Sequence, residues 1–312
     1  MNVQYYINKL TAKLIRSIFH FQTKAVYKQP TVGKYSVESP VVILSMLQEK
    51  DLQMYLLAMK SMMRYITINK AVVVCDPDLS EQSKTVIKQH ITQVEFLNAV
   101  DYSHEKIPSG GCWERLYAIS HLTENYYVIQ MDADILVMNT PEEVKLSITN
   151  NQSFILGTED KFSHLTIKKM AGIANEWVKE GKQRSAAVHV QITAESVMAE
   201  LTSSLGYRSY TRGCAGFAGF SKGSINPNMV LELSSLFYKK MRERWNSWGT
   251  EQFMSNLLLS QQENVQVLPT SKYNSSNHYH SGFVLAHFIG SYRFANLQYT
   301  KLAQKLVREG FE

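Results

Sequence analysis

Short apolar runs of strand length alternate with segments of helical periodicity along most of this 312-residue chain. The runs are rich in β-branched and aromatic residues, and each is too short for a helix. The alternation predicts an α/β fold with a mixed, mostly parallel central sheet flanked by helices. The predicted strands include residues 41–46, 71–75, 126–131, 154–157 and 265–268, and the predicted helices include residues 50–65, 80–90 and 113–119.

The run at residues 126–131 leads into Asp132, Ala133 and Asp134, and a second apolar run follows at residues 135–137. Ligands of open α/β sheets bind beyond the carboxyl ends of the strands, where these aspartates lie. Two carboxylates two positions apart point the same way on an extended chain, and burying both without a partner is costly. A divalent cation such as Mg²⁺ or Mn²⁺ removes that cost, and Ala133 leaves room beside it. The alternative is a strand end with two solvated carboxylates.

A histidine ends another apolar run near the C-terminus. His287 follows residues 284–286, and neutral imidazole is a good ligand for Mn²⁺. Arg293 lies six residues further on, where its planar guanidinium could bind two phosphate oxygens. A lone histidine is more often an ordinary core or surface residue, so the metal assignment requires His287 to meet the two aspartates.

Three further positions each allow two interpretations. Gly216 lies in a run of small residues, which either lets a ligand approach the backbone or packs tightly in the core. Arg115 falls in the first turns of the helix before the central strand, where it either faces the ligand or pairs with a neighbouring glutamate. Glu251 is either a first-turn acid favoured by the helix dipole or an acid that faces a ligand hydroxyl.

Composition narrows the class of protein. The apolar content of 45% and the charged content of 19% are typical of globular chains with a sizeable core. Three cysteines without close spacing argue against a disulfide framework and for a reducing, cytoplasmic setting. No apolar run reaches transmembrane length, and charges interrupt the N-terminal segment, which is unlike a signal peptide.

The excess of positive charge is confined to the N-terminal segment. Six of the 33 basic residues and none of the 27 acidic residues precede Glu38, which leaves 27 basic and 27 acidic residues in the rest of the chain. A nucleic-acid-binding protein needs a basic face on its folded domain, so we expect no nucleic-acid partner.

Residues 1–28 show the periodicity of a basic amphipathic helix. Its apolar positions are Tyr6, Leu10, Leu14, Ile18 and Phe21. Such a helix can lie on an anionic membrane surface, or it can dock on its own domain or on a second subunit. We therefore predict an N-terminal helix and linker over residues 1–38, followed by a single catalytic domain over residues 39–312.

Together these motifs resemble those of GT-A-fold glycosyltransferases, in particular the retaining family that includes glycogenin and bacterial lipopolysaccharide galactosyl- and glucosyltransferases. The stretch from Met131 to Val137 is similar to the Asp-x-Asp segment of that family, and the stretch from His287 to Gly290 is similar to its His-x-x-Gly segment. Glu251 and Gln252 resemble its Asp-Gln pair. The resemblance spans roughly residues 41–294 and implies the GT-A, Rossmann-like fold of nucleotide-sugar transferases.

The resemblance implies transfer of a sugar from a nucleoside diphosphate sugar, with UDP favoured, to an acceptor hydroxyl with retention of configuration. Asp132, Asp134 and His287 would bind Mn²⁺ or Mg²⁺, and Arg115 and Arg293 would stabilise the leaving diphosphate. Gln252 would face the anomeric region, and Glu251 would orient sugar hydroxyls. Further contacts with the donor are expected from Ser45, Asp76, Ala133, Gly216 and Gly290. A glycan or lipid-linked glycan would be the acceptor, in polysaccharide or lipopolysaccharide synthesis at the inner face of a membrane.

Two alternatives remain open. A phosphatase of the haloacid dehalogenase type also has Asp-x-Asp after a strand, but there the motif lies near the start of the domain and a later acidic pair is needed. The other alternative is a nucleotide-sugar- or carbohydrate-binding protein on the same fold that has lost catalysis. The presence of Asp132, Asp134, His287 and Arg293 together favours an enzyme.

Overall fold

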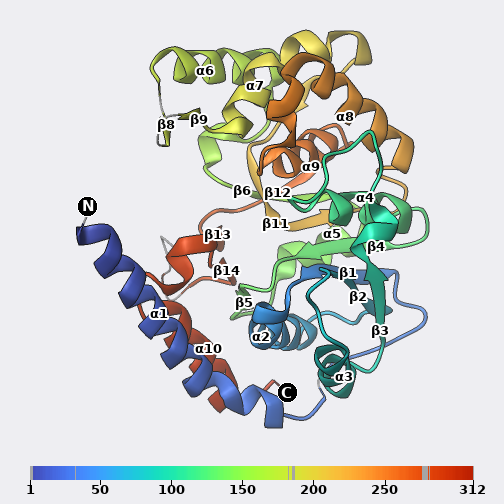
Figure 1. Ribbon diagram of the computed structural model, residues 1–312. Coiled ribbons are helices and arrows are strands. Elements are labelled where there is room, and N and C mark those ends of the chain that lie inside the picture. The colour runs from blue at the N-terminus through green and yellow to red at the C-terminus, as the bar shows by residue number, and fades with distance from the viewer. Residues whose placement is uncertain are drawn as a thin grey trace. The chain divides into compact units, whose positions relative to one another are not determined.

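The computed structural model describes residues 3–31, 33–181, 183–184, 187–275, 280 and 282–311 (Figure 1). The helices are α1 (Val3–Thr23), α2 (Leu52–Met63), α3 (Glu81–His90), α4 (Trp113–Leu122), α5 (Glu142–Thr149), α6 (Ile167–Lys179), α7 (Val190–Leu201), α8 (Pro227–Met241), α9 (Thr250–Ser260) and α10 (Gln298–Glu309). The strands are β1 (Val41–Leu47), β2 (Lys70–Cys75), β3 (Val94–Asn98), β4 (Tyr127–Met131), β5 (Ile135–Val137), β6 (Phe154–Gly157), β7 (Leu165–Thr166), β8 (Gln183–Arg184), β9 (Ala187–Val188), β10 (Ser209–Tyr210), β11 (Gly213–Phe220), β12 (Gln266–Leu268), β13 (Tyr273–Ser275) and β14 (Leu285–His287). Two of the short 3₁₀ helices matter below, η1 (Lys24–Lys28) and η8 (Gly290–Phe294).

The largest sheet among the described residues has seven strands in the order β12-β6-β11-β4-β1-β2-β3. β1 and β2 pair in parallel, as do β12 and β6, whereas β11 runs antiparallel to β6. The apolar runs predicted as strands form β1, β2, β4, β6 and β12, and helices lie between them in the chain. The predicted fold class, an α/β protein with a mixed, mostly parallel sheet flanked by helices, is confirmed.

The chain divides into two compact units, each made of separate stretches of sequence. Unit 1 comprises Met1–Leu97, Met131–Lys145 and Ser271–Glu312, and unit 2 comprises Asn98–Gln130 and Leu146–Thr270. The N-terminal helix belongs to unit 1. The division at residue 38 into a helical segment and a single catalytic domain stays a prediction, and residues 1, 2 and 32 of that segment lie outside the described residues.

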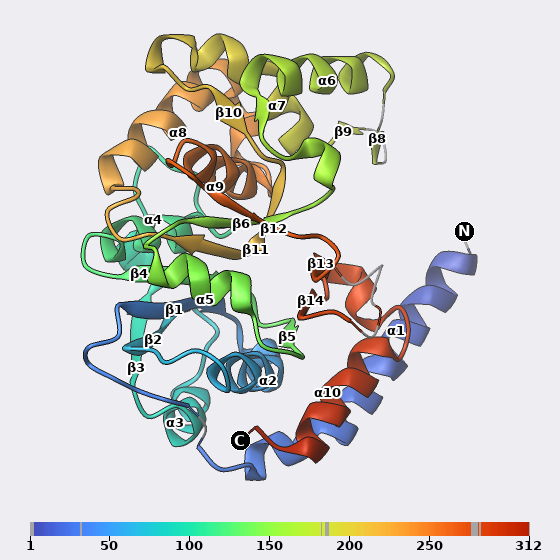
Figure 2. The same ribbon diagram turned by 180° about the vertical axis from the view of Figure 1, so that it is seen from behind.

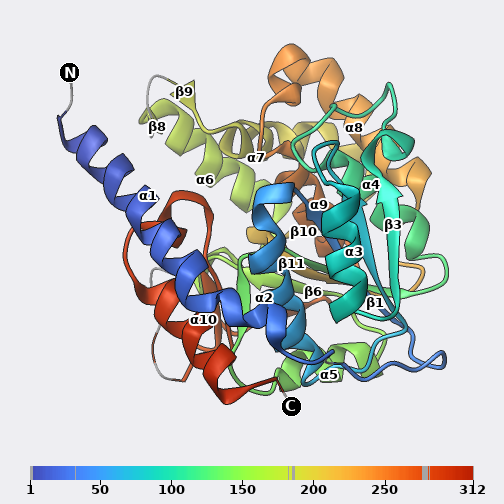
Figure 3. The same ribbon diagram turned by 60° about the horizontal axis from the view of Figure 1, so that its bottom comes forward.

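In unit 1, α1 packs beside α10, as Figures 1 and 3 show. Phe19 is fully buried and stacks on Tyr299 with ring centroids 4.8 Å apart, and Phe294 of η8 meets it edge-on at 5.6 Å. This face differs from the predicted apolar stripe, in which Leu10, Leu14 and Phe21 are exposed. The helix is apolar on two sides, and the aromatic partners available on α10 and η8 decide which side is buried.

In unit 2, α9 packs against β11 and β6, and α7 packs against α6, α8 and α9 (Figure 2). β11 is buried along its whole length, so its glycines and alanines lie in the interior of this unit. The fully buried Trp113, Trp245, Phe237 and Phe253 fill the space among α4, α8 and α9. Among the described residues, none of the helices combines the length and apolar character needed to cross a membrane.

Candidate active site

Strand pairing within unit 1 brings His287 to the Asp-x-Asp motif. β14 pairs antiparallel with β5, so that His287 lies opposite Ile135, and the backbone N–H of Phe288 donates to the carbonyl of Asp134 at 3.0 Å. Side chains alternate between the two sides of a strand, so a shift of one residue in this register would turn the imidazole away. The pairing is therefore the local cause of the meeting of residues far apart in sequence.

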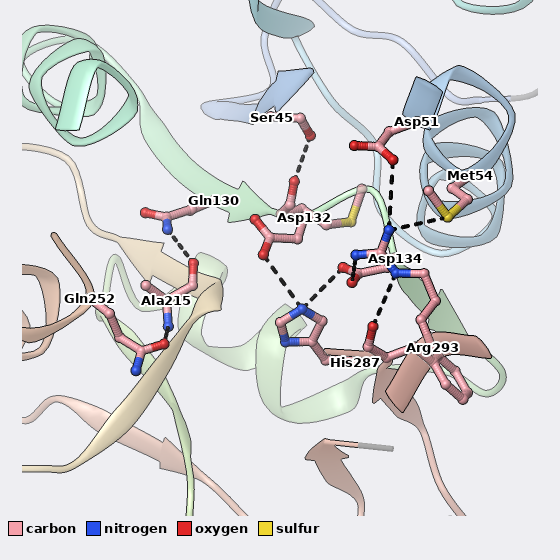
Figure 4. Close-up of polar contacts among 12 residues, drawn as sticks. Ser45, Asp51, Met54, Gln130, Asp132, Asp134, Ala215, Gln252, His287 and Arg293 are labelled. Carbon is pink, nitrogen blue, oxygen red and sulfur yellow. Dashed lines mark hydrogen bonds and ion pairs between the residues drawn. The ribbon is translucent and has the colours of Figure 1, made fainter. Parts of the chain in front are cut away.

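Asp132, Asp134 and His287 point toward one another in Figure 4. Nε2 of His287 lies 3.1 Å from Oδ1 of Asp134 and 3.4 Å from Oδ2 of Asp132. One ligand atom from each of the three residues lies within 4.8 Å of the other two. His287 and Asp134 are buried, whereas Asp132 is half-buried, so the cluster has one accessible side.

Arg293 binds the other side of this cluster from η8. Its Nη2 donates to Oδ2 of Asp134 at 2.5 Å, its Nη1 lies 3.6 Å from Oδ1 of Asp51, and its Nε donates to the carbonyl of Phe288. Burial lowers the pKa of Arg293, but the charges of Asp134 and Asp51 oppose this effect, and the net pKa is raised. Asp51 has no recognisable motif around it, and the sequence analysis missed it.

The residues present fit a divalent cation. Two carboxylates and an imidazole form a mixed oxygen and nitrogen donor set, which suits Mn²⁺ and, through its oxygens, Mg²⁺. The guanidinium of Arg293 contacts Asp134 and Asp51, and its single positive charge balances one of these two carboxylates. The remaining negative charge supports the prediction of a cation at this place.

Four other residues of unit 1 were predicted to contact the donor, and each has a defined position in the structure. The Ser45 hydroxyl on β1 donates to the carbonyl of Met131 at 2.6 Å, directly before Asp132. Ala133 is half-buried in the turn after β4. Asp76 follows β2 and accepts from Nε2 of Gln48 at 3.1 Å. Gly290 opens η8 with a φ of 50°, a left-handed conformation that glycine adopts without strain. Their contacts with a donor stay predictions.

In unit 2, Arg115 and Glu251 form a buried ion pair. Nη2 of Arg115 lies 3.3 Å from each carboxylate oxygen of Glu251, and both side chains are about 95% covered. Their helices are also joined at their first residues, where Nε1 of Trp113 donates to Oγ1 of Thr250 at 3.0 Å. Arg115 therefore pairs with a glutamate, but the pair is buried and the glutamate lies on a different helix, whereas the alternative from the sequence was an exposed charge paired with a neighbouring glutamate. Contact of Arg115 with a donor stays a prediction.

Gln252 lies next to this pair, and two partners orient its amide. The backbone N–H of Ala215 donates to Oε1 of Gln252 at 3.3 Å, and Nε2 of Gln252 donates to Oε1 of Gln191 at 2.8 Å. Gln130 donates from Nε2 to the carbonyl of Ala215 (Figure 4). Gln130 was not among the predicted site residues, although its position two residues before Asp132 on a strand was a signal that could have identified it.

A buried carboxylate continues this chain of hydrogen bonds. Nε2 of Gln191 donates to Oε1 of Glu195 at 3.1 Å, and Glu195 also accepts from Tyr210 at 3.0 Å and from Nε of Arg212 at 2.9 Å. Burial raises the pKa of Glu195, and Arg212 opposes that rise. Because Oε1 of Glu195 accepts these three hydrogen bonds, it directs the Gln191 NH₂ toward itself and the Gln191 oxygen toward Gln252.

The small residues of β11 serve tight packing at two positions. A Cβ at Gly213 would lie 2.3 Å from Ile155, and a Cβ at Gly219 would lie 2.2 Å from the ring of Phe154. These contacts match the core-packing interpretation of the segment. The predicted ligand contact of Gly216, on the same buried strand, stays a prediction.

No protein-family model matches the chain, and no curated protein sequence matches it. Among solved structures, the bifunctional glycosyltransferase WbbM is similar with a TM-score of 0.49 and 13% identity, over 81% of this chain and 46% of that one. The galactosyltransferase LgtC, in complex with donor and acceptor sugar analogues, has a TM-score of 0.42 and 13% identity over 85% of this chain and 95% of its own. Core-mannan synthase A from Aspergillus fumigatus, in a Mn/GDP form, has a TM-score of 0.44 and 11% identity, over 88% of this chain and 87% of its own. These likenesses concern the fold alone.

Proposed function

We propose that this protein is a metal-dependent glycosyltransferase that moves a sugar from a nucleoside diphosphate sugar to an acceptor hydroxyl. The observation that carries this proposal is the meeting of Asp132, Asp134 and His287 beside Arg293. A cation held by two carboxylates and an imidazole, next to a guanidinium, is suited to a diphosphate. The donor that we propose is a UDP-linked sugar.

In this proposal, Asp132, Asp134 and His287 hold Mn²⁺ or Mg²⁺, which when bound neutralises charge on the leaving diphosphate. Arg293 keeps Asp134 in place through Oδ2 and adds positive charge where the leaving group would develop negative charge. Ser45 fixes the backbone before Asp132, which supports a positioning role for its hydroxyl.

For the sugar, we propose that Gln252 faces the anomeric carbon. Arg115 and Glu251 are engaged with each other, so their contacts support a positioning role at the start of α9, where Gln252 lies. The reaction would break the bond between the anomeric carbon and the diphosphate and form the new bond to the acceptor oxygen on the same face. The acceptor proton would pass to an oxygen of the leaving diphosphate, with retention of configuration.

The proposal also covers the acceptor and the cellular location of the reaction. We propose a glycan or lipid-linked glycan as acceptor, in polysaccharide or lipopolysaccharide synthesis at the cytoplasmic face of a membrane. The three cysteines are not joined in disulfides, and all three lie within the described residues. That state supports a reducing compartment.

The proposal is tested with Asp134→Ala. We expect this variant to lose both Mn²⁺ binding, measured by titration calorimetry, and transfer or hydrolysis of UDP-sugars. A loss of three orders of magnitude or more in kcat corresponds to about 4 kcal/mol of lost stabilisation of the transition state. Asp101→Ala, which removes an exposed carboxylate in unit 2, is the matched control and should keep both properties.

Undiminished turnover in Asp134→Ala would refute the metal assignment. Mn²⁺-dependent nucleotide binding by the wild type without transfer or donor hydrolysis would identify a binding protein. Release of phosphate from a generic aryl phosphate, lost in Asp132→Asn, would instead identify the phosphatase alternative.

A further inference from the structure

Helix α1 has two apolar sides, and the described residues of unit 1 bury only one of them. Ile15 and Phe19 are buried, and Phe19 stacks on Tyr299 of α10. Gln29, just beyond η1, donates from Nε2 to the carbonyl of Val307 at 3.0 Å. Contacts with Tyr299 early in α10 and Val307 late in α10 show that the two helices run side by side in the same direction.

The second apolar side of α1 is exposed. Leu10, Leu14 and Phe21 have 66%, 63% and 70% of their surface accessible. With about 100° of rotation per residue, these three side chains fall within a sector of about 40°, centred opposite Phe19. They form a continuous strip along the helix, which we call the outer strip. Its residues match part of the stripe predicted from the sequence.

Positive charge accompanies the outer strip. Lys9, Lys13 and Lys24 are exposed, and Nζ of Lys24 lies 4.7 Å from the ring centre of Phe21. No acidic residue precedes Glu38. The neighbouring α10 adds exposed Lys301, Lys305 and Arg308, of which Lys305 lies 3.7 Å from Glu309. The two-helix pair is therefore strongly cationic on its exposed surface.

We propose that the outer strip of α1 binds an anionic lipid surface, with Leu10, Leu14 and Phe21 inserted among the acyl chains and the lysines at the headgroups. Amphipathic helices bind membranes through such a combination of buried apolar area and attraction to anionic lipids. Docking of α1 through Phe19 holds the helix on the protein while the opposite side remains available to lipid. The helix can thus dock on its own domain and bind a membrane at the same time, which the sequence had left as alternatives.

Charge distinguishes this occupant from a second copy of the chain. Pairing two α1 helices through their outer strips would bring lysines from both copies together, with no acidic residue in either helix to balance them. An anionic bilayer supplies that balancing charge. The proposal does not depend on the glycosyltransferase activity, because it rests on the surface of α1 alone.

The test is co-sedimentation of the full chain with vesicles of phosphatidylglycerol and phosphatidylcholine, compared with vesicles of phosphatidylcholine alone. We expect the wild type to bind the anionic vesicles only, and to be released as salt is raised. The variant with Leu10→Gln, Leu14→Gln and Phe21→Gln should lose at least about tenfold in partitioning. Because these side chains are exposed, its circular dichroism and melting temperature should match those of the wild type.

The matched control carries Val100→Gln, Leu146→Gln and Leu205→Gln, which remove three exposed apolar side chains in unit 2. It should bind vesicles as the wild type does. The proposal is overturned if the wild type does not sediment with anionic vesicles, or if the outer-strip variant binds as well as the wild type. A wild-type dimer that the outer-strip variant converts to a monomer, without vesicle binding, would also overturn it and assign the strip to a second copy.

Discussion

Asp134 divides its two carboxylate oxygens between different partners. Oδ1 faces His287 at 3.1 Å, and Oδ2 accepts from Arg293 at 2.5 Å. Hydrogen bonds between charged groups are stronger than those between neutral groups, so Arg293 fixes the carboxylate while the other oxygen remains directed at the proposed cation site. This single side chain links the metal site to the residue proposed to meet the diphosphate.

Gln191 is the residue that orients the amide of Gln252. Its own orientation follows from Glu195, whose Oε1 accepts from the Gln191 NH₂. We expect Gln191→Leu to lower kcat for donor hydrolysis by about tenfold or more with little change in KM, because the amide of Gln252 loses its fixed direction. Gln191→Glu retains an acceptor for Gln252 and should recover part of kcat.

Gln262→Leu provides the control for this prediction, because Gln262 donates to the carbonyl of Ser224 and is outside this chain of hydrogen bonds. It should leave kcat unchanged. An equal loss in kcat for Gln191→Leu and Gln262→Leu would show that general destabilisation, and not the direction of one amide, is responsible. Steady-state kinetics and melting temperatures of the three variants separate the two causes.

Lys60 is fully buried, and its Nζ donates to the carbonyl of Pro30 at 2.5 Å. Burial lowers the pKa of Lys60 to about 8, below the value of about 10.4 for an unfolded chain. Between these values the unfolded state binds more protons than the folded state, so this residue makes the protein more stable as pH rises. Below about pH 8 both states are protonated, and the penalty of the buried charge is present in full.

Comparison with Lys60→Met isolates this contribution. From about pH 7.5 to 9.5, the free energy of unfolding of the wild type should rise relative to that of the variant by about 1–2 kcal/mol. Urea titrations at several pH values measure the difference. Parallel pH profiles for the two proteins would show that Lys60 is uncharged throughout or retains its ordinary pKa.

At the scale of elements, the docking of α1 depends on a small aromatic cluster. Phe19 is fully buried between Tyr299 and Phe294. We expect Phe19→Ala to lower the free energy of unfolding by about 3 kcal/mol, through lost burial and the cavity that remains. Equilibrium denaturation in urea measures the change.

Leu14→Ala is the internal control on the same helix, because Leu14 is 63% exposed. It should change the free energy of unfolding by less than about 0.5 kcal/mol. If Phe19→Ala is as mild as Leu14→Ala, α1 does not dock through this face in solution. The pair of variants thus compares an apolar residue on the buried side of the helix with one on its exposed side.

At the scale of the whole molecule, we expect ligand binding to raise the free energy of unfolding. A nucleoside diphosphate present with Mn²⁺ at about one hundred times its Kd would stabilise the folded state by about 2.7 kcal/mol. For a chain of this length we expect a rise in melting temperature of about 5 °C. A thermal-shift screen of UDP-, GDP- and CMP-sugars with and without Mn²⁺ measures it and identifies the nucleotide.

Chelation of the metal should remove most of this rise, and Asp134→Ala should show little of it at the same ligand concentration. A full rise in the Asp134→Ala variant would place the nucleotide away from Asp132, Asp134 and His287. A rise with CMP-sugars alone would contradict the proposed UDP donor and leave the metal cluster as a separate question.

Local patterns predicted much of the fold. Apolar runs such as residues 41–46 became β1, because a run of that length that is rich in β-branched residues is short for a helix and favours a buried strand. The Asp-x-Asp motif was identified for a similar reason, since carboxylates at the end of a buried strand require a partner. The partners of Arg115 and Gln252 were not predictable, because Glu251 and Gln191 reach them by the packing of helices and not by spacing along the chain.

The sequence by itself determined the long strands of the central sheet, several of the helices, the basic N-terminal segment and the candidate ligands, because each follows from the chemistry of neighbouring residues. Only the tertiary structure decided that His287 meets Asp134, since that depends on the register of β14 on β5. It also decided which side of α1 is buried, since both sides are apolar and only one meets Tyr299 and Phe294. In both cases the deciding contact joins distant parts of the chain, and local periodicity contains no information about such a contact.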